Sequence, residues 1–175
     1  MTRLAFVLLG VWISAAVAHA QDERVVSKYT STARAKSLSY HESNGEESDG
    51  IRALFPGFGE YKLEHLGGDL RSWLNILFRD KTVDLYAPTM ENGGGTFPHK
   101  ANDVVEWRGI EKQGRFMPYA LIYRIASSND DTRRTKTRLI VIKLDGERSA
   151  VVGYAEGANE DTEAKALADR HRPRG

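Results

Sequence analysis

The chain has 175 residues with 25 Lys and Arg, 24 Asp and Glu, and no cysteine. This length suits one main domain. The absence of cysteine excludes disulfides, thiolate metal sites and cysteine chemistry. The near-balance of charge creates no long-range field that would attract nucleic acid or an anionic membrane, so neither partner is expected.

Residues 1–20 have the pattern of a secretory signal peptide. Arg3 gives a positive start, residues 4–17 form an uncharged apolar run, and Ala18-His19-Ala20 is a cleavage site of small residues. The run is shorter than the ~20 residues that a membrane-spanning helix needs. We therefore expect an exported protein, periplasmic or secreted, that keeps no stable membrane insertion after cleavage.

The segment after the signal is polar and rich in turn residues. We expect one short strand near residues 27–32, and we interpret residues 41–50 as an exposed acidic loop because they lack apolar periodicity. Residues 21–50 are thus predicted to be a polar N-terminal segment, and residues 51–175 a single α+β domain.

The centre of the sequence alternates at the period of a strand. Residues 60–66 and 69–78 are expected to be two strands joined by a tight turn at Gly67-Gly68-Asp69. A helix is the competing interpretation of the second run, since Leu70, Trp73, Leu74 and Leu77 also fit helical spacing. Residues 82–86 are a further short strand, and residues 87–102, which contain three consecutive glycines, are predicted to be a long irregular connection.

In the rest of the chain we expect four more strands, at residues 104–108, 115–126, 137–144 and 150–154, and one helix. Residues 104–108 and 115–126 alternate, with Met117, Tyr119, Leu121, Tyr123 and Ile125 expected to face the core. The nearly continuous apolar run at 137–144 is typical of a central strand that is covered on both faces. Asp-Gly at 145–146 marks a hairpin, and residues 159–171 form a helix with acidic residues in its first turn. The predicted fold is a mostly antiparallel twisted sheet or meander with one C-terminal helix packed on it.

Two acid–arginine pairs are the candidate functional residues. Asp69 and Arg71 are two positions apart on a strand, so both side chains point the same way and could orient a ligand carboxylate or a carbohydrate hydroxyl. Glu106 and Arg108 flank Trp107 in the same spacing, which suits a general acid or base beside an arginine. The alternative interpretation of each pair is a structural ion pair.

These pairs define the candidate site. Glu106 and Asp69 are the catalytic candidates, and the binding candidates are Arg71, Trp107, Arg108 and Tyr61. The histidines have no metal-site spacing, so no metal is predicted, and no cofactor is expected.

Several motifs resemble a family of small exported bacterial proteins without assigned activity. The resemblance lies in Pro56-Gly57, Gly59-Glu60-Tyr61, Gly68-Asp69-Leu70-Arg71, Glu106-Trp107-Arg108, residues 139–144 and Ala158-Asn159. It implies export but no activity. Its members carry cysteines near positions where this chain has Ala53 and Ala150, so the resemblance implies no disulfide here.

We interpret the chain as an exported, non-enzymatic binding or interaction module, with an envelope protein or glycan as its partner. The alternative is an envelope-acting hydrolase that uses an Asp/Glu–Arg site. That alternative requires the two acid–arginine pairs to converge in one concave pocket. The sequence gives no prediction of oligomeric state.

Overall fold

The computed structural model describes residues 23–45, 48–129 and 134–173. The predicted signal peptide at residues 1–20 lies outside these residues. Within the described part, no helix combines the length and the apolar character that crossing a membrane requires.

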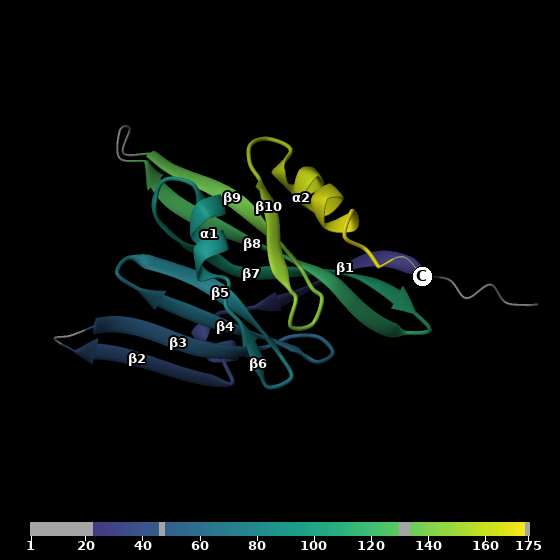
Figure 1. Ribbon diagram of the computed structural model, residues 1–175, viewed down its shortest axis with the longest axis horizontal. Coiled ribbons are helices and arrows are strands. Elements are labelled where there is room, and N and C mark those ends of the chain that lie inside the picture. The colour runs from purple at the N-terminus through teal and green to yellow at the C-terminus, as the bar shows by residue number, and fades with distance from the viewer. Residues whose placement is uncertain (1–22, 46–47, 130–133, 174–175) are drawn as a thin grey trace, which may run out of the picture.

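The chain forms two five-stranded antiparallel sheets (Figure 1). The first sheet has the strands in chain order: β2 (Ser39–Gly45), β3 (Ser48–Pro56), β4 (Tyr61–Gly68), β5 (Arg71–Phe78) and β6 (Lys81–Val83). The second sheet has the order β1-β7-β8-β9-β10: β1 (Arg24–Ser31), β7 (Thr96–Lys112), β8 (Arg115–Asn129), β9 (Arg134–Lys143) and β10 (Ala150–Ala155). The α+β class and the antiparallel pairing are confirmed, whereas the expected single sheet is divided into two.

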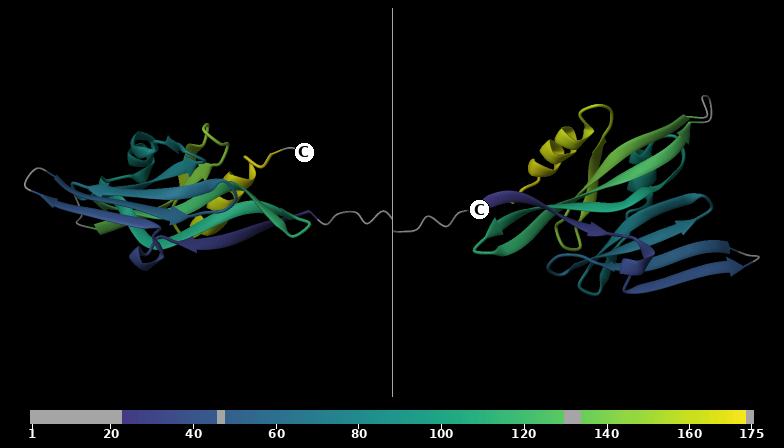
Figure 2. Two further views of the ribbon diagram at one scale, coloured as in Figure 1. Left: turned by 90° about the horizontal axis from the view of Figure 1, so that it is seen from below. Right: turned by 180° about the vertical axis from the view of Figure 1, so that it is seen from behind.

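The main core lies between the inner faces of the two sheets (Figure 2). Period-two alternation brings Leu63, Leu74 and Ile76 of the first sheet against Trp107 and Ile142 of the second, and all five are fully buried. This pattern confirms the strand interpretation of residues 70–78 over the helical one. It also confirms the doubly covered strand at 137–144, because Val141 is buried on the opposite face of β9.

A β-bulge changes the expected facing of β8. Arg108 pairs with Ala120 and Gly109 with Pro118, so Tyr119 is an extra residue in the strand. Leu121, Tyr123 and Ile125 face the main core as predicted. Tyr119 instead packs on the outer face, and Met117 is 40% exposed. The expectation that these two residues face the main core was wrong because period-two counting cannot detect a bulge.

Two helices complete the domain. The predicted C-terminal helix is confirmed as α2 (Glu160–Asp169), which packs Ala164 and Ala168 on the outer face of the second sheet. The first helix, α1 (Tyr86–Gly93), was not predicted. It forms within the segment interpreted as an irregular loop, because Pro88 lies in its first turn, where proline is tolerated, and Gly94 ends it at φ 66°. A single 3₁₀ turn, η1 (Arg34–Lys36), follows β1.

Two further expectations need correction. The acidic segment 41–50 is not a loop where the structure describes it: residues 41–45 belong to β2, an edge strand that tolerates polar residues, and residues 48–50 belong to β3, with which β2 pairs. The strand expected at 82–86 is only β6, because Tyr86 begins α1.

Candidate functional site

The Asp69–Arg71 pair lies at the β4–β5 turn, at one end of the first sheet. β4 continues through Gly68, so the turn residues are Asp69 and Leu70, at φ 49° and 63°, rather than the expected Gly-Gly-Asp. Arg71 Nη1 donates to Asp69 Oδ2 at 2.5 Å. The Asp69 side chain is 83% exposed. The pair therefore stays at the surface.

The Glu106–Arg108 pair lies under α2, on the outer face of the second sheet. Arg108 donates through Nε and Nη2 to the two carboxylate oxygens of Asp169, each at 2.8 Å, and Tyr119 donates to the same carboxylate at 2.5 Å. Glu106 accepts a short hydrogen bond from the Ser27 hydroxyl. We call Arg108, Asp169 and Tyr119 the helix clasp, since they join α2 to the sheet.

The electrostatics of the helix clasp agree with a structural role. The hydrogen bond from Arg108 lowers the pKa of Asp169 below its usual value. The same bond raises the pKa of Arg108. Burial, followed by the bond to Asp169, raises the pKa of Tyr119. Each group is thus held in its ordinary charge state, with no proton available for transfer at neutral pH.

The other two candidate binding residues contribute to the interior. Trp107 is fully buried, and its Nε1 donates to Thr30 Oγ1 at 2.8 Å. The Tyr61 hydroxyl accepts from the Gly146 backbone N–H at 2.9 Å. The structure therefore does not bring the predicted site residues together. Asp69 and Arg71 line one open cavity, whereas Glu106 lines a separate and smaller one, of about 170 Å³, on the outer side of the second sheet.

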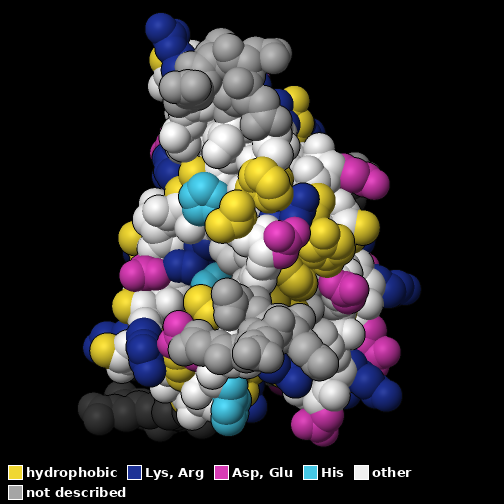
Figure 3. Space-filling view, turned by 90° about the vertical axis from the view of Figure 1, so that its left-hand side faces the viewer, with side chains coloured by type: hydrophobic (Ala, Val, Ile, Leu, Met, Phe, Trp, Pro, Cys, Tyr) yellow, Lys and Arg dark blue, Asp and Glu magenta, His cyan; other side chains and the backbone are white. Residues whose placement is uncertain are grey.

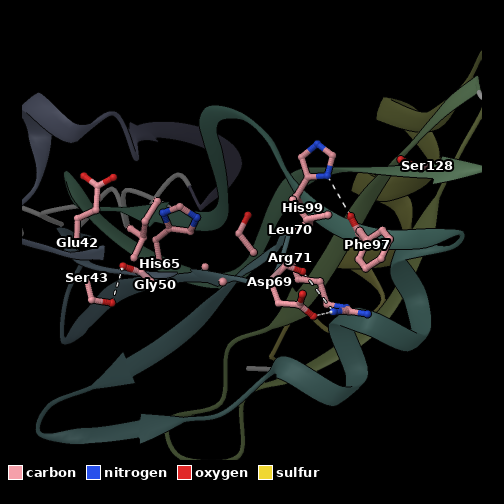
Figure 4. A pocket seen from close by; sticks show the side chains of 14 residues that line it. Glu42, Ser43, Gly50, His65, Asp69, Leu70, Arg71, Phe97, His99 and Ser128 are labelled. Atoms are coloured by element: carbon pink, nitrogen blue, oxygen red, sulfur yellow. Dashed lines mark hydrogen bonds and ion pairs between the residues drawn. The ribbon is translucent and has the colours of Figure 1, made fainter. Parts of the chain in front are cut away.

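That cavity is a groove of about 1140 Å³ at the end of the molecule where the sheets separate (Figure 4). Its floor belongs to the first sheet and includes Gly50, Gly67 and His65. The β4–β5 turn forms one rim, while Phe97 and His99 at the start of β7 form the opposing wall. Figure 3 faces this end, where histidine and hydrophobic side chains lie beside charged ones.

Three residues that line the groove have a left-handed backbone conformation, which is unfavourable for the two bulky ones, Leu70 and Phe97. Asp69, Leu70 and Phe97 all have positive φ, and they make up three of the five such non-glycine residues in the described chain. Leu70 is also 75% exposed. A bulky side chain in the left-handed region costs about 1 kcal/mol or more, and such strain is concentrated at functional sites.

Arg71 connects the β4–β5 turn to Phe97 on the opposite side of the groove. The Arg71 guanidinium lies 4.7 Å from the centre of the Phe97 ring, so the same arginine contacts both Asp69 and Phe97. Ser72 lines the groove, and its Oγ accepts a hydrogen bond of 2.8 Å from the backbone N–H of Lys100, which joins β7 to β5. The groove is thus held open by contacts between the two sheets.

His65 is the most perturbed titratable group of the groove. Burial lowers its pKa to about 4, with Lys100 adding to the effect and Asp103 opposing it. Its Nε2 is enclosed and has no hydrogen-bond partner. The imidazole is therefore neutral at physiological pH.

Sequence reasoning named Asp69 and Arg71 but did not assign Leu70, Phe97, His65 or His99 to a site. The one local signal was Gly67-Gly68, because glycine within a strand marks close approach of another group to the backbone. Phe97 and His99 are about thirty residues away in sequence, and only the pairing of β7 in the second sheet places them there. Among the described residues, no three His, Asp or Glu side chains are arranged to hold a metal ion.

A scan of protein-family models, a search of curated proteins and a search of solved structures each found no match to this chain. The resemblance to small exported bacterial proteins therefore receives no support from a family match.

Proposed function

We propose that this chain is an exported, non-enzymatic binding module whose ligand occupies the groove between the two sheets. The observation that carries the proposal is the placement of three left-handed residues around this groove: Asp69, Leu70 and Phe97. Leu70 and Phe97 carry strain that Gly or Asn would avoid, and such strain is expected where the side chain itself is needed. Export, to the periplasm or to the medium, is proposed from the signal pattern of residues 1–20.

Binding is favoured over catalysis because of how the charged groups are arranged. A hydrolase would need a carboxylate held near a second catalytic group and close to the substrate. In the groove, Asp69 is paired with Arg71, and Glu42 lies 3.7 Å from Arg34. Glu106 and Arg108 lie on the outer face of the second sheet and do not reach this groove.

Site-specific photo-crosslinking tests the proposal in cells that produce the full chain. A benzophenone amino acid replaces Leu70 at the groove rim or, as the matched control, Gln113. Gln113 is also an exposed left-handed turn residue (φ 54°), but it lies in the β7–β8 turn at the opposite end of that strand pair.

We expect an adduct of higher mass with the probe at position 70 and none at position 113. Equal labelling at the two positions, or no adduct at position 70, would overturn the proposal. Analysis of the adduct by protease and glycosidase digestion then identifies the class of the partner.

A further inference from the structure

We infer that the groove binds an uncharged oligosaccharide, an inference that rests on the proposed binding function. Three features distinguish this ligand class from an extended peptide and from an anion: the floor, the charges of the lining, and the side chains that project into the groove. Each of these is a property of the described residues.

The floor of the groove is formed by strands whose backbone hydrogen bonds are already made. Gly50 pairs with Gly68 across β3 and β4, and the neighbouring pair contains Gly67. Both strands are interior strands of the first sheet. An extended peptide that adds to a sheet needs an unpaired strand edge, which this floor does not offer. Between Ile51 and Ser72, which pair with it on either side, Gly67 has no side chain, and this leaves a gap that a sugar ring can approach closely.

The lining carries little net charge and leaves no cation unpaired. Among the described residues that line the groove, Arg71 is the single cation, and Glu42 and Asp69 are the acids. Arg71 is bound to Asp69 and stacked on Phe97. An anionic ligand would have to displace this pair, whereas a neutral ligand leaves it intact.

The side chains that face the groove match the two kinds of surface on a sugar. Serine hydroxyls and histidine imidazoles both donate and accept hydrogen bonds, and the lining supplies them at Ser72, Ser128 and His99. Leu70 and Phe97 offer apolar surface for the C–H face of a ring. The volume of about 1140 Å³ exceeds the ~300–1000 Å³ of usual small-molecule pockets, so several linked sugars fit better than one.

Calorimetric titration of residues 21–175 with three neutral tetrasaccharides tests the inference: chitotetraose, cellotetraose and maltotetraose. The variants are Leu70→Asn and Phe97→Asn, with Gln113→Asn as the matched control. All three replace a left-handed residue with one that tolerates this conformation, so none should unfold the protein. Circular dichroism melting curves check the fold of each.

We expect at least one tetrasaccharide to bind, with affinity at least tenfold lower in Leu70→Asn and Phe97→Asn and unchanged in Gln113→Asn. Equal affinity in all variants would overturn the inference, since the sugar would then bind elsewhere. No binding by any of the three sugars at millimolar concentration, together with a protein adduct at position 70, would overturn the sugar assignment and leave the binding function standing. No binding and no adduct would overturn both.

Discussion

The two acid-x-arginine pairs have the same spacing on a strand but opposite surroundings. Asp69 and Arg71 pair with each other beside an open groove, whereas Arg108 binds Asp169 of α2 and Glu106 accepts from Ser27. The first pair is left accessible because it flanks a hairpin turn, and the second is covered because a helix packs over its strand. The pattern alone therefore identifies charged positions but not which of them face a ligand.

Asp169→Asn is expected to have the largest effect. It removes the charge that Arg108 and Tyr119 bind and turns an amide donor toward a guanidinium. Hydrogen bonds to charged groups are worth about 1.5–3 kcal/mol, so we expect the free energy of unfolding to fall by about 2 kcal/mol. Urea denaturation measures this change. A loss below about 0.5 kcal/mol would contradict the role of the helix clasp.

Local patterns predicted the elements whose side chains alternate strictly. Leu74 and Ile76 on β5 followed a period-two pattern, and residues 139–142 on β9 followed a fully buried pattern, and both segments are strands. The segments that failed were those with mixed signals. Pro88 and the glycines at 93–95 suggested a loop, although one proline in a first turn and a glycine at the end are compatible with a short helix.

The groove could be predicted only in part, because it is built from residues far apart in sequence. Asp69 and Arg71 were found through their local spacing. Phe97 reaches the groove through a register irregularity at the start of β7, and its positive φ has no sequence signature. The division into two sheets, which decides that Glu106 and Asp69 lie apart, depends on long-range pairing that periodicity cannot specify.

His65 in the groove and Asp169 in the helix clasp should lower the free energy of unfolding in different pH ranges as the solution is acidified. The pKa of His65 is lowered from 6.5 to about 4 in the folded protein, so the unfolded chain binds more protons between these values. Stability should therefore fall as the pH drops from 6.5 to 4, on the order of 2 kcal/mol after allowance for partial exposure. The pKa of Asp169 is lowered from 3.8, so its contribution is present above pH 3.8 and is lost as the pH falls further.

The control for this prediction is His65→Phe, which keeps a ring in the same place and cannot titrate. Its free energy of unfolding should change much less between pH 6.5 and 4 than that of the wild type. NMR titration of the His65 ring in the wild-type protein gives an independent measurement, and a midpoint near 6.5 would contradict the enclosed imidazole of the groove.

Leu70→Asn should raise stability. Asn occupies the left-handed region more easily than Leu, and Leu70 is mostly exposed, so little buried surface is lost. We expect the free energy of unfolding to increase by about 1 kcal/mol, with a similar increase for Gln113→Asn. If Leu70→Asn instead destabilises the protein, Leu70 has a packing role and its conformation is not evidence for a binding site.

Asp69→Asn makes the same chemical change as Asp169→Asn, in the opposite surroundings, and should have the smallest effect. Asn keeps the shape and the tolerance for positive φ, and an exposed ion pair contributes only about 0–1 kcal/mol. We expect the free energy of unfolding to stay within about 0.5 kcal/mol of the wild type, as measured by urea denaturation. The difference between the stability losses of Asp169→Asn and Asp69→Asn measures how much more an acid–arginine contact contributes when it lies between α2 and the sheet than when it is exposed. Equal losses would mean that the two pairs have the same structural role, and the groove pair would then no longer be distinguished as the one left free for a ligand.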